Sequence, residues 1–357
     1  MPLDPFVHDT LGQRVILEAG GAAKHLAAEV SRLGADRVML IAAEAESHLA
    51  DRVTAGLPVA LRWTEVAQHV PVELAERARE AAASAAVDLL VAVGGGSTVG
   101  LAKAIALTAR VPIVAVPTTY AGSEATAVWG LTEGREKTTG THPSVLPVTV
   151  VYDATLTVSL PVGLSVASGF NALAHCVDSM WAPGSDPINR ALAVEGIRVF
   201  ASGLPKVVAD PAGLEGRDEC LYGAYLSAVS FASAGSGLHH KICHVLGGAY
   251  RLPHAETHAI VLPHVLALNA PAVPDRGRRI AEAFGGGEPL AALERLRAAV
   301  AAPRALKDVG FDEAAVGEAA ARILPGVPPS NPAPVDRRVL ETLLRAAWAG
   351  DTPGGAA

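Results

Sequence analysis

The chain of 357 residues has room for two domains, each able to bury its own hydrophobic core. A formal net charge of −7, without a basic stripe, argues against nucleic-acid binding, and no apolar run reaches the length of a membrane span. The three cysteines show no CxxC spacing and the N-terminus lacks the features of a signal peptide, so we expect a soluble cytoplasmic protein without a disulfide framework.

Short apolar runs alternate with helical patterns in the first part of the chain. The expected strands are 14–18, 37–43, 59–63, 87–93, 112–116 and 148–152, and the expected helices are 22–33, 46–55, 71–86 and 97–109. This alternation, with continuous apolar strands, indicates a parallel sheet that is covered on both faces. The glycine-containing stretch 131–147 is expected to form a loop or a hairpin before the last strand.

Helical periodicity dominates from about residue 161 onward. Breaks are expected at 183–184, 210–213, 285–287 and 325–334, where Pro, Gly and Asp interrupt the pattern. The sequence therefore predicts an α/β protein with an added all-α part. We expect a Rossmann-like dinucleotide-binding domain over residues 1–157, a helical substrate or catalytic domain over 158–357, and an active site in the cleft between them.

A glycine-rich loop follows the expected strand 87–93. Three consecutive glycines allow a close approach of the backbone to a pyrophosphate, and the next residues begin a helix whose N-terminus favours anions. The pattern differs from G-x-G-x-x-G, and a tight strand–helix turn is an equal alternative for this loop alone. The candidate cofactor-binding residues here are Gly94, Gly95, Gly96, Ser97 and Thr98.

A second loop, Pro117-Thr-Thr-Tyr-Ala-Gly-Ser-Glu124, follows the next expected strand. Two such loops at the carboxyl ends of neighbouring strands are typical of the ligand crevice of an open α/β sheet. Together they favour a dinucleotide. The candidates in the second loop are Thr118, Thr119, Tyr120 and Ser123.

Histidines are concentrated late in the chain, where six of the twelve lie between His239 and His264. His240 and His244 are four residues apart, so a helix would place both rings on one face. We expect Gly247-Gly248 to end that helix and Pro253 to precede the next. A second helix would carry Asn171 and His175 at the same spacing. One such pair is usually solvated or packed in a core, but this density of histidines predicts an active site that binds a metal or moves protons.

These stretches together resemble the iron-containing alcohol dehydrogenase superfamily and, within it, the maleylacetate reductases. The resemblance is carried by GGGSTVGLAKAIAL, VPTTYAGSEAT, KTTG, SGFNALAHCVD, GLHHKICHVLGGAY and LPHAETHAIVLPHV. It implies NADH or NADPH as cofactor, a homodimer, and cofactor contacts from Lys137 and Lys103. Support of its own helix is the alternative role for Lys103.

The superfamily's metal site has one aspartate and three histidines, and by position these correspond to Asn171, His175, His240 and His254. An amide thus replaces the only anionic ligand, as the resemblance to maleylacetate reductases implies. Without that charge a ferrous ion is poorly compensated, although three imidazoles can hold zinc. We therefore expect no metal.

The activity implied by the resemblance is reduction of the conjugated C=C bond of maleylacetate to 3-oxoadipate, in the catabolism of aromatic compounds. His175, His240, His244 and His254 are collectively expected to stabilise the enolate and deliver a proton. Lys241, with His239, is the candidate for binding a substrate carboxylate, and a solvated surface position is an equal alternative for Lys241.

The chain departs from the family pattern after KTTG, where Thr141-His-Pro-Ser144 and Val148 stand in place of basic residues. Two other activities therefore stay open: reduction of a different conjugated keto acid in a biosynthetic pathway, and a metal-dependent alcohol dehydrogenase of the same superfamily. The strand 37–43 ends in Ala42-Ala43-Glu44 and does not decide between NADH and NADPH.

Overall fold

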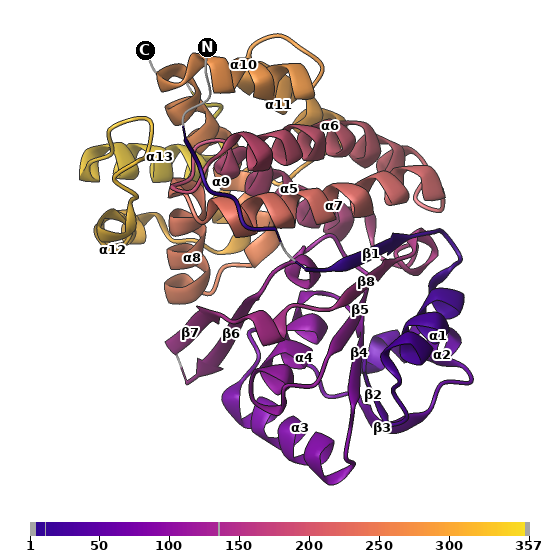
Figure 1. Cartoon of the computed structure of the whole chain (residues 1–357). Helices are drawn as coiled ribbons and strands as arrows, with labels where there is room; N and C mark the ends of the chain where they lie inside the picture. The colour runs from indigo at the N-terminus through magenta and orange to yellow at the C-terminus, as the bar shows by residue number, and fades with distance from the viewer. Residues whose placement is uncertain (1–4, 11, 135, 354–357) are drawn as a thin grey trace. The chain divides into compact units, whose positions relative to one another are not determined.

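The computed structural model describes residues 5–10, 12–134 and 136–353; the side chains of residues 136 and 137 are not part of this description. The chain forms two compact units. The α/β unit comprises residues 11–160 and 212–221, and the helical unit comprises residues 1–10, 161–211 and 222–357. Figure 1 labels their elements.

The α/β unit is built on one parallel sheet of six strands. In order across the sheet they are β1 (Arg14–Leu17), β8 (Thr149–Tyr152), β5 (Ile113–Pro117), β4 (Leu89–Gly94), β2 (Val38–Ile41) and β3 (Val59–Trp63). Because β2, β4 and β5 are neighbours and parallel, the loops that follow them all leave the same edge of the sheet. The expected parallel sheet is confirmed.

Helices cover both faces of this sheet (Figure 1). They are α1 (Ala22–Leu33), α2 (Ser47–Thr54), α3 (Val72–Ser84) and α4 (Gly96–Ala109). Successive residues of a strand point to opposite faces, so Val91 and Val93 pack against α1 and α2, whereas Leu90 and Ala92 pack against α3 and α4. This explains why the strands are apolar without alternation.

A small antiparallel hairpin stands apart from the main sheet. It pairs β6 (Val128–Glu133) with β7 (Glu136–Thr141), so the stretch predicted as a loop or hairpin is a hairpin. Short 3₁₀ turns complete the unit: η1 (Glu44–Glu46), η2 (Ser123–Ala125), η3 (Pro143–Val145) and η4 (Ala154–Leu156).

The helical unit is arranged around α5, in which every residue from Gly169 to Ser179 is buried. This helix packs against α6 and α9, and a second apolar core joins α8, α9, α12 and α13. The helices are α5 (Val162–Ser179), α6 (Pro187–Ala209), α7 (Leu214–Ala234, which begins in the α/β unit), α8 (Leu238–Tyr250), α9 (His254–Asn269), α10 (Pro274–Ala283), α11 (Pro289–Ala299), α12 (Val316–Ile323) and α13 (Arg337–Ala349). The 3₁₀ turns are η5 (Ala270–Ala272), η6 (Leu306–Val309), η7 (Glu313–Ala315) and η8 (Leu324–Gly326).

One helix boundary differs from the expectation. Gly247 and Gly248 lie inside α8, which continues to Tyr250 and ends where Arg251 adopts a left-handed conformation. The Tyr250 ring packs edge-on against Phe311, with ring centroids 5.2 Å apart, so a contact from far along the sequence extends the helix past its glycines.

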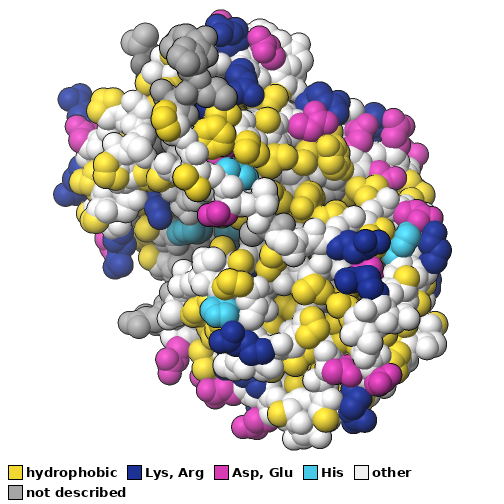
Figure 2. All heavy atoms as spheres, in the orientation of Figure 1, with side chains coloured by type: hydrophobic (Ala, Val, Ile, Leu, Met, Phe, Trp, Pro, Cys, Tyr) yellow, Lys and Arg dark blue, Asp and Glu magenta, His cyan; other side chains and the backbone are white. Residues whose placement is uncertain are grey.

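The surface carries both signs of charge. Figure 2 shows Lys and Arg side chains interspersed with Asp and Glu on the face in view, without a broad basic stripe. Among the described residues, no helix is both long enough and apolar enough to cross a membrane.

Candidate active site

Five histidines of the helical unit form one cluster of rings. His175 comes from α5, His240 and His244 from α8, and His254 and His258 from α9. Ring centroids lie 5.0 Å apart for His175–His240, 6.0 Å for His240–His244, 5.0 Å for His240–His258 and 4.4 Å for His254–His258. The four predicted catalytic histidines are thus linked through ring contacts, with His258 in the middle of the group.

An aromatic ring from α7 closes one side of the cluster. Phe231 lies 4.7 Å from the His175 ring and 4.3 Å from the His240 ring, measured between centroids. An apolar wall beside two imidazoles reduces their hydration, and this weakens their basicity. No sequence motif pointed to Phe231.

The cluster has a buried part and an exposed part. His175, His240 and His258 are buried, whereas His244 and His254 are exposed to solvent. Burial lowers the pKa of His175 to about 3 and that of His240 and His258 well below the usual value. The three buried rings are therefore neutral near pH 7, and only the exposed rings can exchange protons directly with water.

A carboxylate stands behind His240. Asp178, one turn after His175 on α5, is wholly buried, and its Oδ2 lies 2.7 Å from His240 Nδ1. The backbone N–H of Gly237 donates to the same oxygen over 2.8 Å. Burial raises the pKa of Asp178 to about 7, and the N–H groups at the start of α8 oppose that rise. The spacing 171, 175, 178 would have signalled that Asp178 shares the face of the other two residues.

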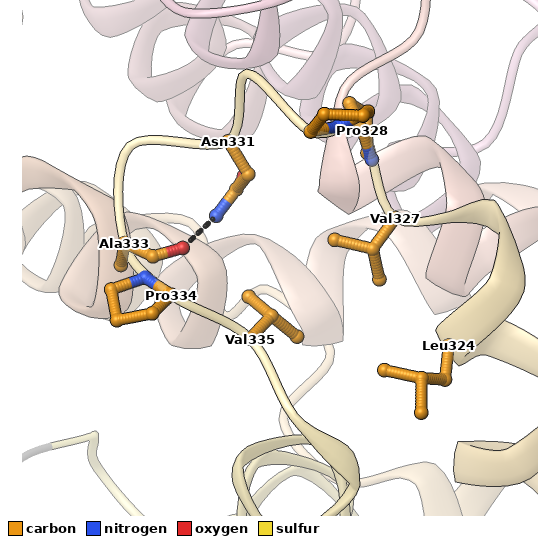
Figure 3. A pocket seen from close by; sticks show the side chains of 8 residues that line it. Leu324, Val327, Pro328, Asn331, Ala333, Pro334 and Val335 are labelled. Carbon is orange, nitrogen blue, oxygen red and sulfur yellow. Dashed lines mark hydrogen bonds between the residues drawn. The ribbon is translucent and has the colours of Figure 1, made fainter.

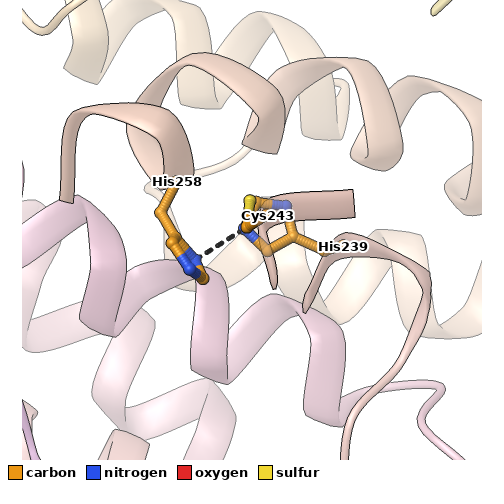
Figure 4. Close-up of side chains that lie close together, drawn as sticks. All are labelled: His239, Cys243 and His258. Atoms are coloured by element: carbon orange, nitrogen blue, oxygen red, sulfur yellow. Dashed lines mark hydrogen bonds between the residues drawn. The ribbon is translucent and has the colours of Figure 1, made fainter. Parts of the chain in front are cut away.

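His239 and Cys243 of α8 lie beside His258 of α9 (Figure 4), and the His239 ring also adjoins the cluster, with its centroid 5.3 Å from that of His240 and 4.9 Å from that of His258. His239 Nε2 lies 3.0 Å from His258 Nδ1, and Cys243 Sγ lies 3.6 Å from the same His239 nitrogen. Among the described residues, these three are the His, Cys, Asp or Glu side chains whose ligand atoms all lie within 4.8 Å of one another. Burial raises the pKa of the Cys243 thiol well above its usual range, so in the absence of an ion the sulfur keeps its proton. The outer nitrogens of both rings also lack the acceptors that metal-binding histidines normally have. The trio is therefore a hydrogen-bonded group.

Lys241 does not join the ring cluster. It is half-buried on α8, and its aliphatic stem lies near Gly326 of η8. A role for Lys241 toward a substrate carboxylate stays a prediction.

A groove of the helical unit has no ionisable residue in its lining (Figure 3). It encloses about 280 Å³, and the Asn331 side chain donates across it to the Ala333 carbonyl over 2.8 Å. Its lining consists of Leu324, Val327, Pro328, Pro329, Asn331, Ala333, Pro334 and Val335. Nothing in this lining can transfer a proton or bind a charge.

In the α/β unit, the glycine-rich loop connects β4 directly to the N-terminus of α4. Gly94 has a φ of +154°, and a Cβ atom there would overlap Thr98 Oγ1 and the Glu46 carboxylate. A Cβ atom at Gly95 would lie 3.0 Å from Thr119 Cγ2. The bare backbone and the helix N-terminus together form the kind of site that binds phosphate groups.

The second loop follows β5 beside it. The Thr118 hydroxyl donates to the Glu46 carboxylate over 2.5 Å, and burial raises the pKa of that carboxyl. The acidic residue against the glycine loop is thus Glu46, not the Glu44 considered from sequence. Tyr120 is wholly buried. Burial and the nearby Cys220 thiol raise the pKa of its hydroxyl, and Arg217 opposes this rise. The side chain of Lys137 lies outside the described residues.

Lys103 holds the second loop in shape. It is buried on α4, and its Nζ donates to the carbonyl oxygens of Ser123, Thr126 and Val128 over 2.5, 2.8 and 2.9 Å. Burial lowers the pKa of Lys103 to about 7. A nitrogen enclosed in this way holds the loop in place, and a cofactor contact for Lys103 stays a prediction.

Comparison with known proteins matches both units. Residues 13–154 match the model of the iron-containing alcohol dehydrogenases, and residues 165–348 match the C-terminal model of the Fe-containing alcohol dehydrogenase family. The chain belongs to the iron-containing alcohol dehydrogenase family. It is therefore an oxidoreductase, as the resemblance implied.

Similar family members come from several bacteria. A maleylacetate reductase from Pseudomonas sp. (strain P51) is 42% identical over 350 residues, covering 98% of this chain and 99% of that protein. The structure of an iron-containing alcohol dehydrogenase from Corynebacterium glutamicum is 57% identical with a TM-score of 0.97, covering 99% of both chains. The structure of a maleylacetate reductase from Rhizobium sp. strain MTP-10005 is 39% identical with a TM-score of 0.93, covering 98% of this chain and 100% of that chain.

The family name raises the question of whether these residues suit iron. The four positions are Asn171, His175, His240 and His254, and all four donors are neutral. The Asn171 amide oxygen and His240 Nε2 are buried without a hydrogen-bond partner among the described residues, yet the three histidines are not among the groups whose ligand atoms converge within 4.8 Å. A ferrous ion would have no anionic ligand here. The donor set therefore does not fit iron.

Proposed function

We propose that this chain reduces the conjugated C=C bond of maleylacetate to give 3-oxoadipate, with NADH or NADPH as the reductant. The main observation in support is the cluster of neutral imidazoles beside Asn171. It gathers groups that can move protons, and the metal-site positions include no anionic ligand. The names of similar reductases support the same reaction.

A nicotinamide cofactor held by the glycine-rich loop would supply the hydride that adds to the alkene carbon β to the ketone. The substrate then carries an enolate, and a proton must reach the adjacent carbon to complete the addition of two hydrogens. We assign the proton to the exposed rings of His244 and His254, because they can be recharged from water between turnovers. The neutral buried rings of His175, His240 and His258 pack behind them and cannot be recharged from water in this way.

The glycine-rich loop and the N-terminus of α4 would bind the pyrophosphate of the cofactor. Gly94 and Gly95 support this role, because neither position has room for a side chain without displacing Thr98 or Thr119. Glu46 lies beside the loop and accepts the Thr118 hydroxyl, which ties the loops after β4 and β5 together.

We further propose that turnover needs no metal and that the protein acts in the cytoplasm as a homodimer. The neutral donor set supports the first statement. The outer edge of β1 supports the homodimer, because Val15 and Leu17 are exposed there at the end of the sheet. Light scattering on the purified protein tests the assembly.

The decisive assay mixes purified protein with reduced nicotinamide cofactor and maleylacetate, and identifies 3-oxoadipate by chromatography. A panel of other 2-en-4-oxo acids tests the alternative of a different conjugated keto acid. Simple aldehydes and alcohols with added iron or zinc test the alternative of a metal-dependent alcohol dehydrogenase. Cofactor oxidation with an aldehyde plus metal, and none with any enoate, would show the proposal to be wrong.

A further inference from the structure

The two ring nitrogens of His240 lie in opposite environments. Nδ1 is 2.7 Å from Oδ2 of Asp178. Nε2 is buried and has no hydrogen-bond partner among the described residues, while the ring itself contacts His175, His258 and Phe231. Nδ1 is therefore held by Asp178, whereas Nε2 is the nitrogen that remains available within the ring cluster.

The direction of the hydrogen bond follows from what else Oδ2 does. This oxygen already accepts the backbone N–H of Gly237 over 2.8 Å, at the start of α8. The N–H groups of Gly237 and the start of α8, with the Trp181 side chain, favour the ionised form of the Asp178 carboxyl. An ionised carboxylate has only acceptor oxygens, so with Asp178 ionised Nδ1 of His240 carries the ring proton.

The backbone is shaped to permit this contact. A Cβ atom at Gly237 would overlap the carboxylate of Asp178, so only glycine allows the start of α8 to approach α5 this closely. The positive end of α8 also faces the carboxylate and favours its acceptor role. Asp178 thus forms one arrangement with Gly237 and His240, although about sixty residues separate it from them in the sequence.

We propose that Asp178 is a positioning residue that holds His240 with its proton on Nδ1, so that His240 Nε2 is a hydrogen-bond acceptor in the cluster and not the donor of the proton to the product. The catalytic meaning of this inference rests on the proposed reduction, whereas the tautomer does not. A bare Nε2 can hold a water molecule or a protonated neighbouring ring in place. This assignment gives His240 a different role from His244 and His254, a distinction that the sequence alone could not make.

The test combines ¹⁵N NMR of the histidine rings with steady-state kinetics on the full-length protein. His240→Gln identifies the His240 signals. Asp178→Ala removes the acceptor, whereas Asp178→Asn can keep an amide oxygen at the position of Oδ2. The matched control is Asp186→Ala, because Asp186 likewise bonds a histidine (His8 Nδ1, 2.7 Å) and caps α6, but lies outside the cluster.

We expect wild-type His240 to be protonated on Nδ1, and Asp178→Ala to populate both tautomers. Loss of such a supporting partner typically costs about 10–100-fold in activity, so kcat should fall by that order in Asp178→Ala while KM for the cofactor is unchanged. Asp178→Asn should retain both the tautomer and most of kcat, and Asp186→Ala should lose stability but not kcat.

Three results would overturn the inference: a wild-type proton on Nε2, an unchanged kcat in Asp178→Ala, or a kcat in Asp178→Asn that falls as far as in Asp178→Ala although the tautomer is kept. Should Asp178→Ala fail to fold, the wild-type spectrum still decides the tautomer. A protein that does not reduce maleylacetate but shows Nδ1–H would remove the proposed function and leave the positioning role of Asp178 standing.

Discussion

The hydrogen bond between His239 Nε2 and His258 Nδ1, 3.0 Å long, joins α8 to α9 within the ring cluster. Both rings are wholly buried or nearly so. His258 is therefore part of the site and not a bystander at its flank, which is how the sequence alone would rank it. Substitutions of His244 and of His258 should consequently have different effects.

Replacing His244 with Phe should lower kcat by roughly 10²–10⁴-fold, the usual cost of losing a general acid. Phe keeps an aromatic ring of similar size and removes both nitrogens. Stability should change little, because the side chain is exposed. Cofactor affinity should also be unchanged, because the glycine-rich loop belongs to the α/β unit.

The measurement for His244→Phe is kcat beside the melting temperature, with His25→Phe as the control. His25 is a partly exposed histidine of the α/β unit that pairs with Glu18. A His244→Phe protein that turns over at the wild-type rate would mean that the proton comes from elsewhere, with His254 the next candidate.

Replacing His258 with Phe should destabilise the fold. The change removes the partner of His239 in a wholly buried site, and an unsatisfied buried group costs about 1–3 kcal/mol in the free energy of unfolding. Urea denaturation of the two proteins measures this difference. Equal unfolding free energies would show that the bond between the two rings contributes nothing.

Replacing Gly95 with Val should abolish cofactor binding while the protein stays folded. A Cβ atom at this position already lies 3.0 Å from Thr119 Cγ2, and the extra methyl groups would fill the space in front of the N-terminus of α4. Titration calorimetry with NADH checks this result. Gly163→Ala is the control, because a Cβ atom there meets nothing within 4 Å. Wild-type NADH affinity in a folded Gly95→Val protein would falsify the assignment of the loop.

Replacing Asn171 with Asp should raise the affinity for zinc or iron, because it restores an anionic oxygen ligand beside the imidazoles. The wild-type protein should keep its activity after exhaustive chelation. Titration of both proteins with metal, followed by elemental analysis, measures the difference. Loss of wild-type turnover with EDTA, and its recovery with added metal, would contradict the metal-free proposal.

Acid should destabilise the protein through its buried histidines, and His264 isolates one such contribution. Burial, with Arg297 nearby, lowers the pKa of His264 to about 4. An unfolded histidine has a pKa of about 6.5, so between these values the unfolded state binds more protons and the free energy of unfolding falls as the pH falls.

His264→Leu should reduce this pH dependence by up to about 1.4 kcal/mol per pH unit, the effect of one proton. Urea denaturation of the wild-type protein and the variant, between about pH 7 and about pH 5, measures the two slopes. Parallel slopes would mean that His264 is protonated to the same extent in the folded and unfolded states.

Sequence patterns predicted most of the α/β unit because its strands and helices are short and are bounded by local signals. Helix Ala22–Leu33 ends at Gly34 in a left-handed conformation, and strand Val59–Trp63 has the expected bounds. The end of α8 was predicted wrongly because local glycines suggested a stop, whereas Tyr250 gains a contact with Phe311 that no local pattern reveals.

The site was predictable where its residues share one helix. The four-residue spacing gave Asn171 with His175, and His240 with His244. The residues that the sequence analysis missed have partners on other elements. Asp178 bonds His240 of α8, Phe231 of α7 packs against the His240 ring, and Glu46 bonds Thr118 in the loop after β5. The spacing along α5 could have shown that Asp178 shares a face with His175, but its partner on α8, like the partners of Phe231 and Glu46, depends on packing, which has no signature along the chain.

The Lys103 ammonium also limits how this protein can be altered. Its nitrogen needs the carbonyl groups of Ser123, Thr126 and Val128 to converge on one point, so the number of residues between them is fixed. Insertions that surface loops usually tolerate would here separate the oxygens from a buried charge. Efforts to change cofactor preference should therefore substitute residues within this loop and leave its length unchanged.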